Sequence, residues 1–574
     1  SMAYVIKQEL CSACHRCRTG CPVQAIRFKN AKYWIDPEKC KACGKCVKVC
    51  HNGCISDPER PAPAAPAHEK LVKECDVCVI GGGGAGLIAA NKALDLGCSV
   101  IALEKMHEVG GSSWYAGGFR IHWCQKSAEL GIEDNRKAKY EEFLEKVEHR
   151  VDPELLARMF EANEQFADWL IDEHDMLKDY EVKQGHMGPG PAVTIFEARD
   201  AWYDAPKRID RMIGPGEIGS YMAEHMSAEF LKNGGELLLK TSGKKLLTDA
   251  DGKICGVLAQ DEGGEVEIRC KAVVVASGAF SRNKEMMDKF QPMFYDNAGK
   301  EPIHIFTGAG ATGDGIAMCD ALGADIDYVN RRVNMFGPMR HPYPCASMAV
   351  YQNHDGFEIG SQGDLIHAHM GVEVSELAKD PKWHGWKIVD DAICETAIAE
   401  AMQEPPQSKG MDLPKFQANW RAVFAEEELD RAIVSADTLE ELAVKLEIPA
   451  ELLVQEVAAY NASTSEPLVF PPDFPEFMKP KHPPMKIEKA PFYAIKMKMF
   501  HENSIGGMTI DKNASVLKQG KPIPGLYAAG DTTRGIMVSG DIGVDYLEGV
   551  FTSLTMAYNE GYIAGTEAAG YAKK

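Results

Sequence analysis

Apolar and polar residues follow two different periods along the chain. From residue 75 the sequence CDVCVI predicts a short buried strand; a glycine turn, a stretch with helical spacing and a second apolar strand ending at Glu104 come after it. Between residues 415 and 462, the segments ANWRAVFAEEELDRAIV and LEELAVKLEI are amphipathic at helical spacing. The pattern predicts a β-α-β unit near the start of a large domain and a helical region much later.

Residues 57–70, DPERPAPAAPAHEK, contain four prolines and show no apolar periodicity. This composition is typical of a semi-rigid linker, which we place at residues 58–73. At roughly 150 residues per domain, the 574 residues of the chain are enough for three or four structural units. We therefore expect a small unit at residues 1–57 and a much larger part after the linker.

The charge of the chain excludes some classes of partner. Asp and Glu number 84 against 63 Lys and Arg, which gives a net charge of -21, so neither nucleic acid nor an anionic membrane surface is an expected partner. No run approaches the roughly 20 apolar residues of a transmembrane helix, and the first ten residues lack the features of a secretory signal. We expect a cytoplasmic protein without a transmembrane segment, and the sequence leaves its oligomeric state open.

Nine of the 18 cysteines fall within the first 54 residues. Eight of them form two runs of the pattern C-x2-C-x2-C-x3-C, and corresponding members are 29 residues apart (11 to 40, 21 to 50), which indicates an internal duplication. Clustered cysteines in a chain without an export signal favour metal ligation over a disulfide framework. The two runs are Cys11, Cys14, Cys17 and Cys21, then Cys40, Cys43, Cys46 and Cys50.

These runs resemble those of the bacterial two-cluster ferredoxins, over residues 1 to about 57. The resemblance implies two 4Fe-4S clusters, each of which takes the fourth cysteine of the other run. One cluster would then be held by Cys11, Cys14, Cys17 and Cys50, and the other by Cys40, Cys43, Cys46 and Cys21. His51 departs from the family, because proline usually follows the second run. The alternative, a pair of zinc sites, typically uses two separated C-x2-C pairs.

Gly81, Gly83 and Gly86 occupy the positions of a G-x-G-x-x-G turn between the predicted strand and helix. In this motif the glycines permit a tight turn, close approach to a pyrophosphate and close packing of the helix on the strand. Glu104 follows Gly86 by 18 residues, near the spacing of about 20 at which an acidic residue meets ribose hydroxyls. The sequence therefore predicts a dinucleotide-binding site.

Four further stretches carry a resemblance to a known family. They are GGSSWYAGG at 110–118, AVVVASGAF at 272–280, ATGDGI at 311–316 and PGLYAAGD at 524–531. In these stretches the chain resembles the flavoprotein subunits of the fumarate reductase and succinate dehydrogenase superfamily. The resemblance covers about residues 74–574 and implies FAD as the cofactor, with Asp531 reaching the ribityl chain of the flavin.

The resemblance also implies the fold class, an α/β flavoprotein with a Rossmann-like FAD domain and an inserted α+β capping domain, behind a small α+β ferredoxin-like domain. We place the FAD domain at residues 74–330 and 501–574 and the capping domain at 331–500. The candidate FAD-binding residues are Gly81, Gly83, Gly84, Ala85, Gly86, Glu104, Lys105, Gly110, Gly111, Ser112, Ser113, Gly117, Gly118, Ala276, Ser277, Gly278, Asp314, Gly530 and Asp531.

Flavin reduction of a carbon-carbon double bond needs a proton donor and a group that polarises the activating carbonyl. The chain lacks most of the residues that serve fumarate reductases. Alignment of the final turn puts Asp541 where the carboxylate-clamping arginine would stand, Asn503 replaces a ligand histidine, and no arginine follows Gly356 at the proton-donor position. Because a carboxylate repels a carboxylate, a C4 dicarboxylate substrate is not expected.

Other residues are candidates for the missing roles. Three histidines are the first candidates for proton delivery, and two tyrosines are the second. Two arginines are the candidates for stabilising an oxyanion. With Asp541, the candidate catalytic residues are His341, His367, His369, Arg331, Arg332, Tyr351 and Tyr546.

The combination predicts an FAD-dependent reductase of an activated double bond, an enoate or enone rather than fumarate, that receives electrons through two 4Fe-4S clusters. We expect an external low-potential donor: a ferredoxin, a flavodoxin or a flavin partner that oxidises NADH. Three alternatives stay open: a 3-ketosteroid-type dehydrogenase, an enzyme resembling adenylylsulfate reductase, and an electron-transfer subunit without a substrate of its own.

Overall fold

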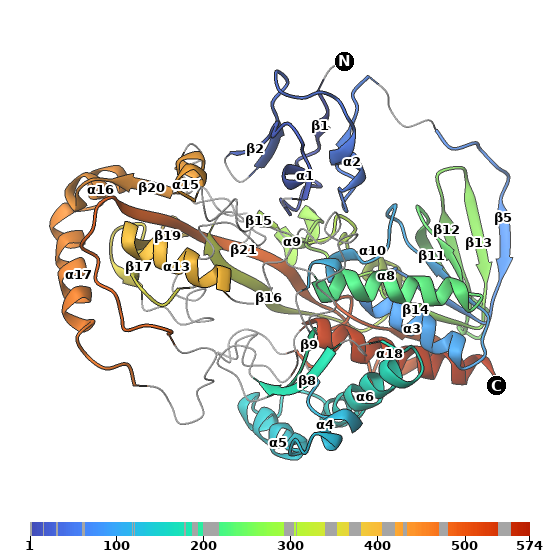
Figure 1. Cartoon of the computed structure of the whole chain (residues 1–574). Coiled ribbons are helices and arrows are strands. Elements are labelled where there is room, and N and C mark those ends of the chain that lie inside the picture. The colour runs from blue at the N-terminus through green and yellow to red at the C-terminus, as the bar shows by residue number, and fades with distance from the viewer. Residues whose placement is uncertain are drawn as a thin grey trace.

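The computed structural model contains a small N-terminal module, a main domain and a capping domain (Figure 1). It describes residues 3–14, 16–29, 32–59, 64–116, 119, 121–176, 180–185, 193–198, 217–291, 304–305, 307–338, 350, 353–366, 380–403, 420–428, 433–469, 480–537, 551 and 553–574.

A six-stranded sheet forms the centre of the main domain. Its strands are β6 (Val77–Ile80), β7 (Val100–Leu103), β10 (Glu236–Leu238), β14 (Ala272–Val275), β22 (Ser515–Lys518) and β23 (Lys521–Ala528), in the order β10-β7-β6-β14-β23-β22. Neighbouring strands are parallel except β22 and β23. All residues of β6, β7 and β14 are buried, which explains their continuous apolar sequences.

Three long helices pack on or near this sheet: α3 (Gly84–Asp95), α8 (Glu217–Lys232) and α18 (Ser553–Ala572). α3 contacts β6 and β7, α18 contacts β14 and β23, and α8 packs on α3 (Figure 1). The β-α-β unit predicted from residue 75 is therefore β6, α3 and β7. Together with the mixed sheets, it confirms the expected α/β fold class.

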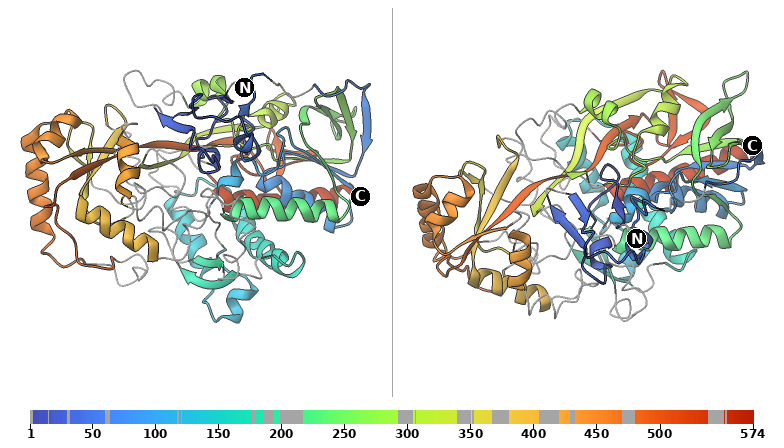
Figure 2. Two further views of the ribbon diagram at one scale, coloured as in Figure 1. Left: turned by 45° about the horizontal axis from the view of Figure 1, so that its top comes forward. Right: turned by 90° about the horizontal axis from the view of Figure 1, so that it is seen from above.

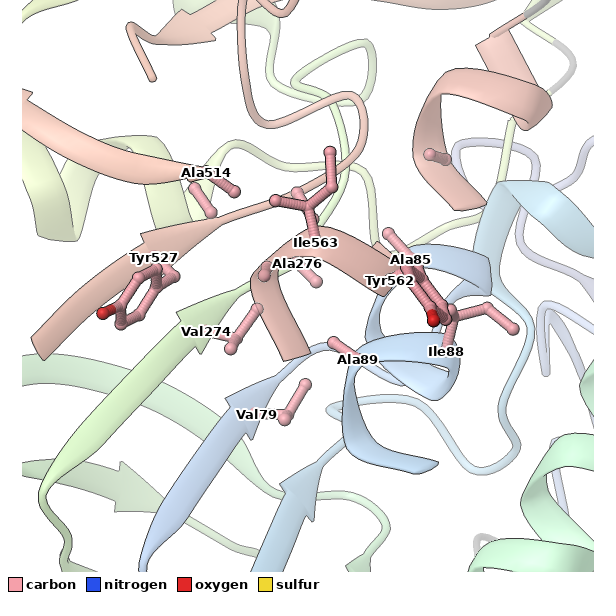
Figure 3. Close-up of a cluster of buried hydrophobic side chains, with 14 of the residues drawn as sticks. Val79, Ala85, Ile88, Ala89, Val274, Ala276, Ala514, Tyr527, Tyr562 and Ile563 are labelled. Atoms are coloured by element: carbon pink, nitrogen blue, oxygen red, sulfur yellow. The ribbon is translucent and has the colours of Figure 1, made fainter. Parts of the chain in front are cut away.

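Helices α3 and α18 approach each other closely because small residues line their contact. Gly561 and Gly565 of α18 face the backbone of Ala85 and Ala89, and a Cβ atom added at Gly565 would lie 2.5 Å from the Ala89 carbonyl oxygen. Figure 3 shows part of the buried cluster around this contact. Its labelled members are Val79, Ala85, Ile88, Ala89, Val274, Ala276, Ala514, Tyr527, Tyr562 and Ile563.

A four-stranded sheet lies beside the main sheet, in the order β11-β12-β13-β5. Its strands are β5 (Leu71–Glu74), β11 (Ser242–Thr248), β12 (Ile254–Gln260) and β13 (Glu265–Arg269). β5 pairs in parallel with β13, and Lys70 lies 2.9 Å from Glu265 and 2.6 Å from Glu267. The end of the expected linker is thus a strand anchored to the main domain, because β13 offers a free edge.

The remaining elements of the main domain connect these layers. Their bounds are η1 (Gly111–Tyr115), α4 (Gln125–Glu129), α5 (Arg136–Lys146), α6 (Pro153–Asp172), β8 (Tyr180–Gly185), β9 (Val193–Ala198), α9 (Lys284–Phe290) and α10 (Asp314–Asp320). α6 begins with Pro153 after an Asp152 cap whose side chain accepts from the Glu154 and Leu155 amides, a combination that favours a helix start.

The capping domain is built on β21 (Phe492–Met508), a 17-residue strand that also reaches the main domain (Figures 1 and 2). The other strands of its sheet are β15 (His304–Ile305), β16 (Ile326–Pro338), β17 (Phe357–Gly360), β18 (Leu365–Ile366), β19 (His384–Asp390) and β20 (Ile433–Ala436). β16 and β21 cross the boundaries placed at residues 330 and 500. These boundaries stay a prediction, since a continuous sheet rather than a linker joins the two domains.

Helices α13 (Asp391–Gln403), α15 (Trp420–Glu428), α16 (Leu439–Leu446) and α17 (Ala450–Ser463) complete the cap. The predicted helical segments correspond to α15 and α16, but residues 433–436 are a strand because β20 pairs with β21. A second hydrophobic core holds these helices on the sheet. His482 ties the chain before β21 to the cap, with Asp355 and Glu400 at 2.5 and 2.6 Å from its two ring nitrogens.

The N-terminal module repeats its backbone as well as its sequence. Its elements are β1 (Val5–Ile6), α1 (Arg16–Thr19), β2 (Ile26–Lys29), β3 (Lys32–Ile35), α2 (Lys45–Lys48) and β4 (Ile55–Ser56). Ala13 and Ala42, 29 residues apart, both have φ of 50°, and Gln24 and Gly53, at the same offset, have φ of 49° and 59°. The duplicated sequence therefore folds into two similar turns around one small core.

Among the helices that the structure describes, none has the length and apolar character needed to cross a bilayer.

The contact between α3 and α18 generates a stability prediction. Gly565→Ala should lower the free energy of unfolding by about 1–3 kcal/mol, because its Cβ overpacks the contact. Gly570→Ala on the same helix is the matched control, since its Cβ would meet no atom within 4 Å, and it should raise stability by up to about 1 kcal/mol through helix propensity. Chemical denaturation of the FAD-loaded protein measures both; equal effects would contradict the packing argument.

Candidate functional site

An open cleft of about 820 Å³ lies at the carboxyl ends of the central strands. Ile80 at the end of β6, Leu103 at the end of β7 and Ala529 after β23 line it. In open α/β sheets, ligands bind outside the carboxyl ends of the strands. The position of the cleft is therefore the one expected of a dinucleotide site.

Most of the candidate cofactor residues line this cleft. They are Gly81, Gly83, Gly84, Ala85, Glu104, Lys105, Gly111, Ser112, Ser113, Ala276, Ser277, Gly278, Asp314, Gly530 and Asp531. Gly86 and Gly110 are not part of the lining: a Cβ at Gly86 would meet the Gly81 carbonyl, and the Gly110 amide donates to Gly82. Gly117 and Gly118 lie outside the described residues. The contact of each residue with FAD stays a prediction.

The glycine turn between β6 and α3 has room for a ligand backbone. Gly81 has φ of 109°, and a side chain there would collide with the Ala276 carbonyl. At Gly83 a Cβ would find its nearest atom 3.9 Å away, the Gly110 oxygen. The turn before α3 thus leaves open space beside the Gly83 backbone, an arrangement that lets a pyrophosphate approach the start of the helix.

Two charged residues after β7 reach different parts of the cleft. Glu104 is 7% exposed and accepts from the Gly82 and Met106 amides, each at 2.8 Å; burial raises the pKa of its carboxyl group. Lys105 bridges to α10, with its Nζ atom 2.6 Å from the Asp314 carboxylate. Glu104 is therefore held in place by backbone amides at the position expected of the ribose-binding acid.

Sequence reasoning missed several residues of the lining. They are Met106, Thr241, Ser242, Gly243, Gly308, Gly310, Ala311 and Ala557. The glycine-rich run TGAGATGDG at 307–315 was a usable signal for three of them. The start of β11, which brings residues 241–243 to the cleft, has no comparable signal because it depends on how the four-stranded sheet packs.

Sequence reasoning also missed Glu560, a buried residue of α18 that holds one loop of the cleft lining. Its carboxyl group accepts from the Gly530 amide at 2.8 Å and from the Thr533 hydroxyl at 2.9 Å, and it is 1% exposed. Burial, with a contribution from the charge of Asp531, raises the pKa of Glu560 to about 8. Glu560 is therefore mostly protonated at neutral pH and fixes the loop that carries Gly530 and Asp531.

The candidate catalytic residues fall largely outside the described part of the chain. His341, His367, His369, Tyr351, Asp541 and Tyr546 lie outside the described residues. Arg331 and Arg332 lie on β16, opposite Ile505 and Ser504 of β21, in a stretch described by its backbone alone. Their catalytic roles stay predictions.

The charge interactions among the cysteines of the two runs fall into two sets. Burial, with the nearby thiolates of Cys50 and Cys11, raises the pKa of Cys14 to about 11. Burial likewise raises the pKa of Cys46 to about 11, and its neighbouring thiolates are Cys40, Cys21 and Cys43. In these interactions the fourth cysteine of each run acts on the other run, in keeping with the ferredoxin resemblance, and the assignment of the eight ligands to two clusters stays a prediction.

Backbone amides point at sulfur in both groups. The Ala13 amide lies 3.3 Å from the Cys11 sulfur, and the equivalent Ala42 amide lies 3.4 Å from the Cys40 sulfur. Such bonds to sulfur tune cluster potentials. Cys54, the ninth cysteine of the module, is 3% exposed and its sulfur lies 3.3 Å from that of Cys50.

The N-terminal module docks on η1, the turn that also lines the cleft. His51 is buried and stacks on Trp114, with ring centroids 4.6 Å apart. Its two ring nitrogens contact the Glu108 carboxylate and, at 3.2 Å, the Gly111 carbonyl oxygen. The residue that departs from the ferredoxin pattern is therefore central to the contact between the two sites.

Tyr115 completes this interface. The Ser12 hydroxyl donates to the Tyr115 oxygen at 3.0 Å, and the Tyr115 hydroxyl donates to the Asn52 side-chain oxygen at 3.2 Å. The same Asn52 oxygen accepts from the Ala309 amide at 3.2 Å, and Cys14 packs against the core of the main domain. The interface is thus specific and adjoins the first cysteine run.

Comparison with known proteins identifies both parts of the chain. A family model described as FAD binding domain matches residues 76–540. The chain belongs to this family. A second family model, described as a 4Fe-4S dicluster domain, matches residues 3–51. The resemblances to fumarate reductase flavoproteins and to two-cluster ferredoxins are therefore confirmed.

Three curated relatives illustrate the family. The chain is 26% identical over 505 residues to NADH:fumarate oxidoreductase of Klebsiella pneumoniae, covering 87% of this chain and 48% of the relative. It is 27% identical to urocanate reductase of Eggerthella lenta (90% and 77% covered) and 26% identical to vinyl phenol reductase of Lactiplantibacillus plantarum (86% and 96% covered). The chain thus spans about half the length of the first relative.

Solved structures show the same fold. An open conformation of a flavocytochrome c3 fumarate reductase matches with a TM-score of 0.64 at 20% identity, covering 88% of this chain and 79% of the other. A 3-ketosteroid Δ1-dehydrogenase from Sterolibacterium denitrificans matches with a TM-score of 0.65 at 18% identity, covering 87% and 100%. Both likenesses concern the fold of the main and capping domains.

The residues that the structure brings together fit the cofactors of these families. The cleft combines an open glycine turn, a buried carboxyl group and the loop bearing Asp531, which suit the pyrophosphate, ribose and ribityl groups of FAD. The two groups of four cysteines suit iron-sulfur ligation. When bound, FAD would supply hydride chemistry and the clusters would supply single electrons.

The buried carboxyl group of Glu560 generates a pH prediction. A group whose pKa is raised from 4.5 to about 8 on folding costs stability progressively as the pH rises from 4.5 to 8. Glu560→Gln should therefore match the parent protein near pH 5 and be more stable than it by a few kcal/mol at pH 8.5, because each tenfold change in proton affinity corresponds to about 1.4 kcal/mol.

Denaturant unfolding of the FAD-loaded protein across this pH range measures the effect. Glu567→Gln, on the same helix and at intermediate burial, is the control and should track the parent protein. A difference between Glu560→Gln and the parent protein that does not change with pH would contradict the raised pKa.

The stacking of His51 on Trp114 generates a second prediction. His51→Ala removes an aromatic contact and a charged hydrogen bond worth together about 1–2 kcal/mol, so release of the module should become about 5- to 30-fold more frequent. Cleavage after Glu59, an exposed linker residue, by a glutamate-specific protease should accelerate by that factor while the iron content stays constant. His149→Ala, at an exposed histidine paired with Glu145, is the control; an unchanged cleavage rate in His51→Ala would show that the stack does not hold the module.

Proposed function

We propose that this protein is an FAD-dependent reductase of an activated carbon-carbon double bond, an enoate or an enone and not fumarate, that receives electrons from an external donor through two 4Fe-4S clusters. The observation that carries the proposal is the shared turn η1. Gly111, Ser112 and Ser113 line the cleft, while Trp114 and Tyr115 contact the cysteine module.

This arrangement supports electron delivery to a flavin. A one-electron donor gives single electrons, whereas reduction of a double bond takes an electron pair. A flavin can accept electrons singly and release them as a pair. His51 and Asn52 hold the module against η1 and the 308–311 loop. The chain's own role in this step is to keep the two sites in contact and to exclude water from the interface, where Ser12, His51 and Asn52 are buried.

The reductive direction is supported by the relatives as well. Their names describe reductases of fumarate, urocanate and vinyl phenol, which share a carbon-carbon double bond and little else. Asp541, in place of a carboxylate-binding arginine, disfavours a dicarboxylate. We assign proton delivery to one of His341, His367, His369, Tyr351 and Tyr546, and polarisation of the carbonyl to Arg331 or Arg332.

A 3-ketosteroid-type dehydrogenase is the second candidate, because a steroid dehydrogenase shares the fold of the main and capping domains. The cysteine module favours the reductase, since two clusters beside the flavin site suit a supply of single electrons from a carrier to the flavin. The capping domain, with its own hydrophobic core, disfavours an electron-transfer subunit without a substrate. An enzyme like adenylylsulfate reductase is disfavoured by Asp541, which would repel an anionic nucleotide.

The substrate class is tested by anaerobic oxidation of reduced methyl viologen with FAD- and iron-loaded protein. The panel contains fumarate, urocanate, an aryl enoate and a steroidal enone. We expect turnover of an enoate or enone, with kcat/KM for fumarate lower by about 100-fold or more, because an unpaired carboxylate in the site costs about 3 kcal/mol. Asp541→Arg is the matched variant and should gain fumarate turnover if the alignment of the final turn is correct.

Three other results of this assay would change the proposed function. Fumarate turnover comparable to that of the best enoate would overturn the exclusion of dicarboxylates. Reduction of the flavin without turnover of any compound would favour the electron-transfer subunit. Oxidation of a 3-ketosteroid by the protein with an artificial acceptor, without reductase activity, would favour the dehydrogenase.

A further inference from the structure

The N-terminal module carries the opposite charge to the rest of the chain. Residues 1–57 contain ten lysines and arginines against four aspartates and glutamates, a net charge of +6. The chain as a whole has a net charge of -21, so residues 58–574 contribute -27. A positive module on a strongly negative protein attracts anionic partners to one place only.

Four lysines concentrate this charge around the second cysteine run. Lys39, Lys41, Lys45 and Lys48 are exposed, as is Cys43 between them. Val47, on the same helix α2, is 36% exposed. Among the described residues none of the four lysines takes part in an ion pair. We call this surface the lysine face: Lys39, Lys41, Cys43, Lys45, Val47 and Lys48.

The other cysteine run is turned towards the main domain. Cys14 packs against the core of that domain, and Ser12 and His51 bond to Tyr115 and Gly111 there. Figure 1 shows the module seated on the main domain, with the capping domain on another side. The module therefore has an inner side, occupied by the flavoprotein, and an outer side where the second run and its lysines meet solvent.

Resting on the proposed function, we propose that the lysine face docks an acidic one-electron carrier protein. At each encounter the carrier would be oxidised by one electron, and the 4Fe-4S cluster that Cys40, Cys43, Cys46 and Cys21 would hold would be reduced by it. Two encounters supply the two electrons for one double bond, and solvent supplies the two protons. Exposed charge beside a small exposed apolar side chain suits a transient interface, which buries little surface and relies on electrostatic steering.

The charge distribution also excludes the wrong docking sites. An acidic carrier is repelled by residues 58–574, so its productive encounters are confined to the lysine face. Steering of this kind raises association rates by about 10- to 1000-fold at low ionic strength. It is screened over a Debye length of about 10 Å at 0.1 M salt, so the reaction with the carrier should slow as salt is added.

The test reverses three charges on the lysine face. The variant Lys41→Glu/Lys45→Glu/Lys48→Glu is compared with Lys253→Glu/Lys489→Glu/Lys521→Glu, which makes the same change in net charge at exposed lysines of the main and capping domains. The donors are a reduced acidic flavodoxin, a reduced acidic two-cluster ferredoxin and, as a cationic small molecule, reduced methyl viologen. Stopped-flow absorbance follows flavin reduction without substrate, so the result does not depend on which alkene is reduced.

We expect the lysine-face variant to lose at least about 10-fold in the rate constant with one or both protein carriers at low salt, and to lose the salt dependence of the parent protein. The control should stay within about 2-fold, and reduced methyl viologen, which is a cation, should reduce the lysine-face variant at least as fast as the parent protein. Binding of the oxidised carrier, measured by titration calorimetry, should weaken in parallel and requires no turnover.

Three results would overturn the proposal. An equal loss in the control variant would mean that net charge alone matters. An equal loss with methyl viologen would mean that the substitutions damage electron transfer rather than docking. Unchanged rates with both carriers would show that carriers use another surface. A failure to reduce any alkene would overturn the proposed function and leave this measurement valid.

Discussion

A single turn, η1, serves two partners at once: its first three residues line the FAD cleft and its last two pack against the cysteine module. Electron transfer slows steeply with separation, so the turn must hold both sites at one spacing. Several contacts fix it: the Gly308 amide donates to Ser112 at 3.0 Å, the Gly84 amide donates to Ser113 at 3.3 Å, and His51 stacks on Trp114. The rest of the fold is arranged so that these contacts are possible.

The close approach of α3 and α18 is one such arrangement. Small residues let α18 lie directly against α3, and this position brings Glu560 under the loop of Gly530 and Asp531. A buried carboxyl group is costly when charged and much less so when protonated and hydrogen-bonded. The raised pKa of Glu560 is therefore a consequence of the packing that shapes the far end of the cleft, and the same packing keeps the glycine turn at the near end open.

How much the sequence predicts depends on how local the signal is. The cysteine runs and the glycine turn are short motifs with fixed spacing, so their residues could be named before the structure. Glu560, Thr241 and the partners of His51 could not, because each acquires its role from a contact with a segment far away in the chain. The helical pattern of residues 418–434 fails at its last two residues for the same reason, since Ile433 and Val434 pair with β21 and this pairing overrides a local amphipathic pattern.

The N-terminal module makes a different kind of contact at each end of the electron path. The inner side of the module meets the flavoprotein through buried aromatic rings and hydrogen bonds, a contact that persists. The outer side offers exposed lysines, whose attraction for a partner is long-ranged and weak enough to reverse. A relay needs both kinds of contact: a permanent one towards the flavin, so that each electron is delivered, and a transient one towards the carrier, so that the spent carrier leaves before the next arrives.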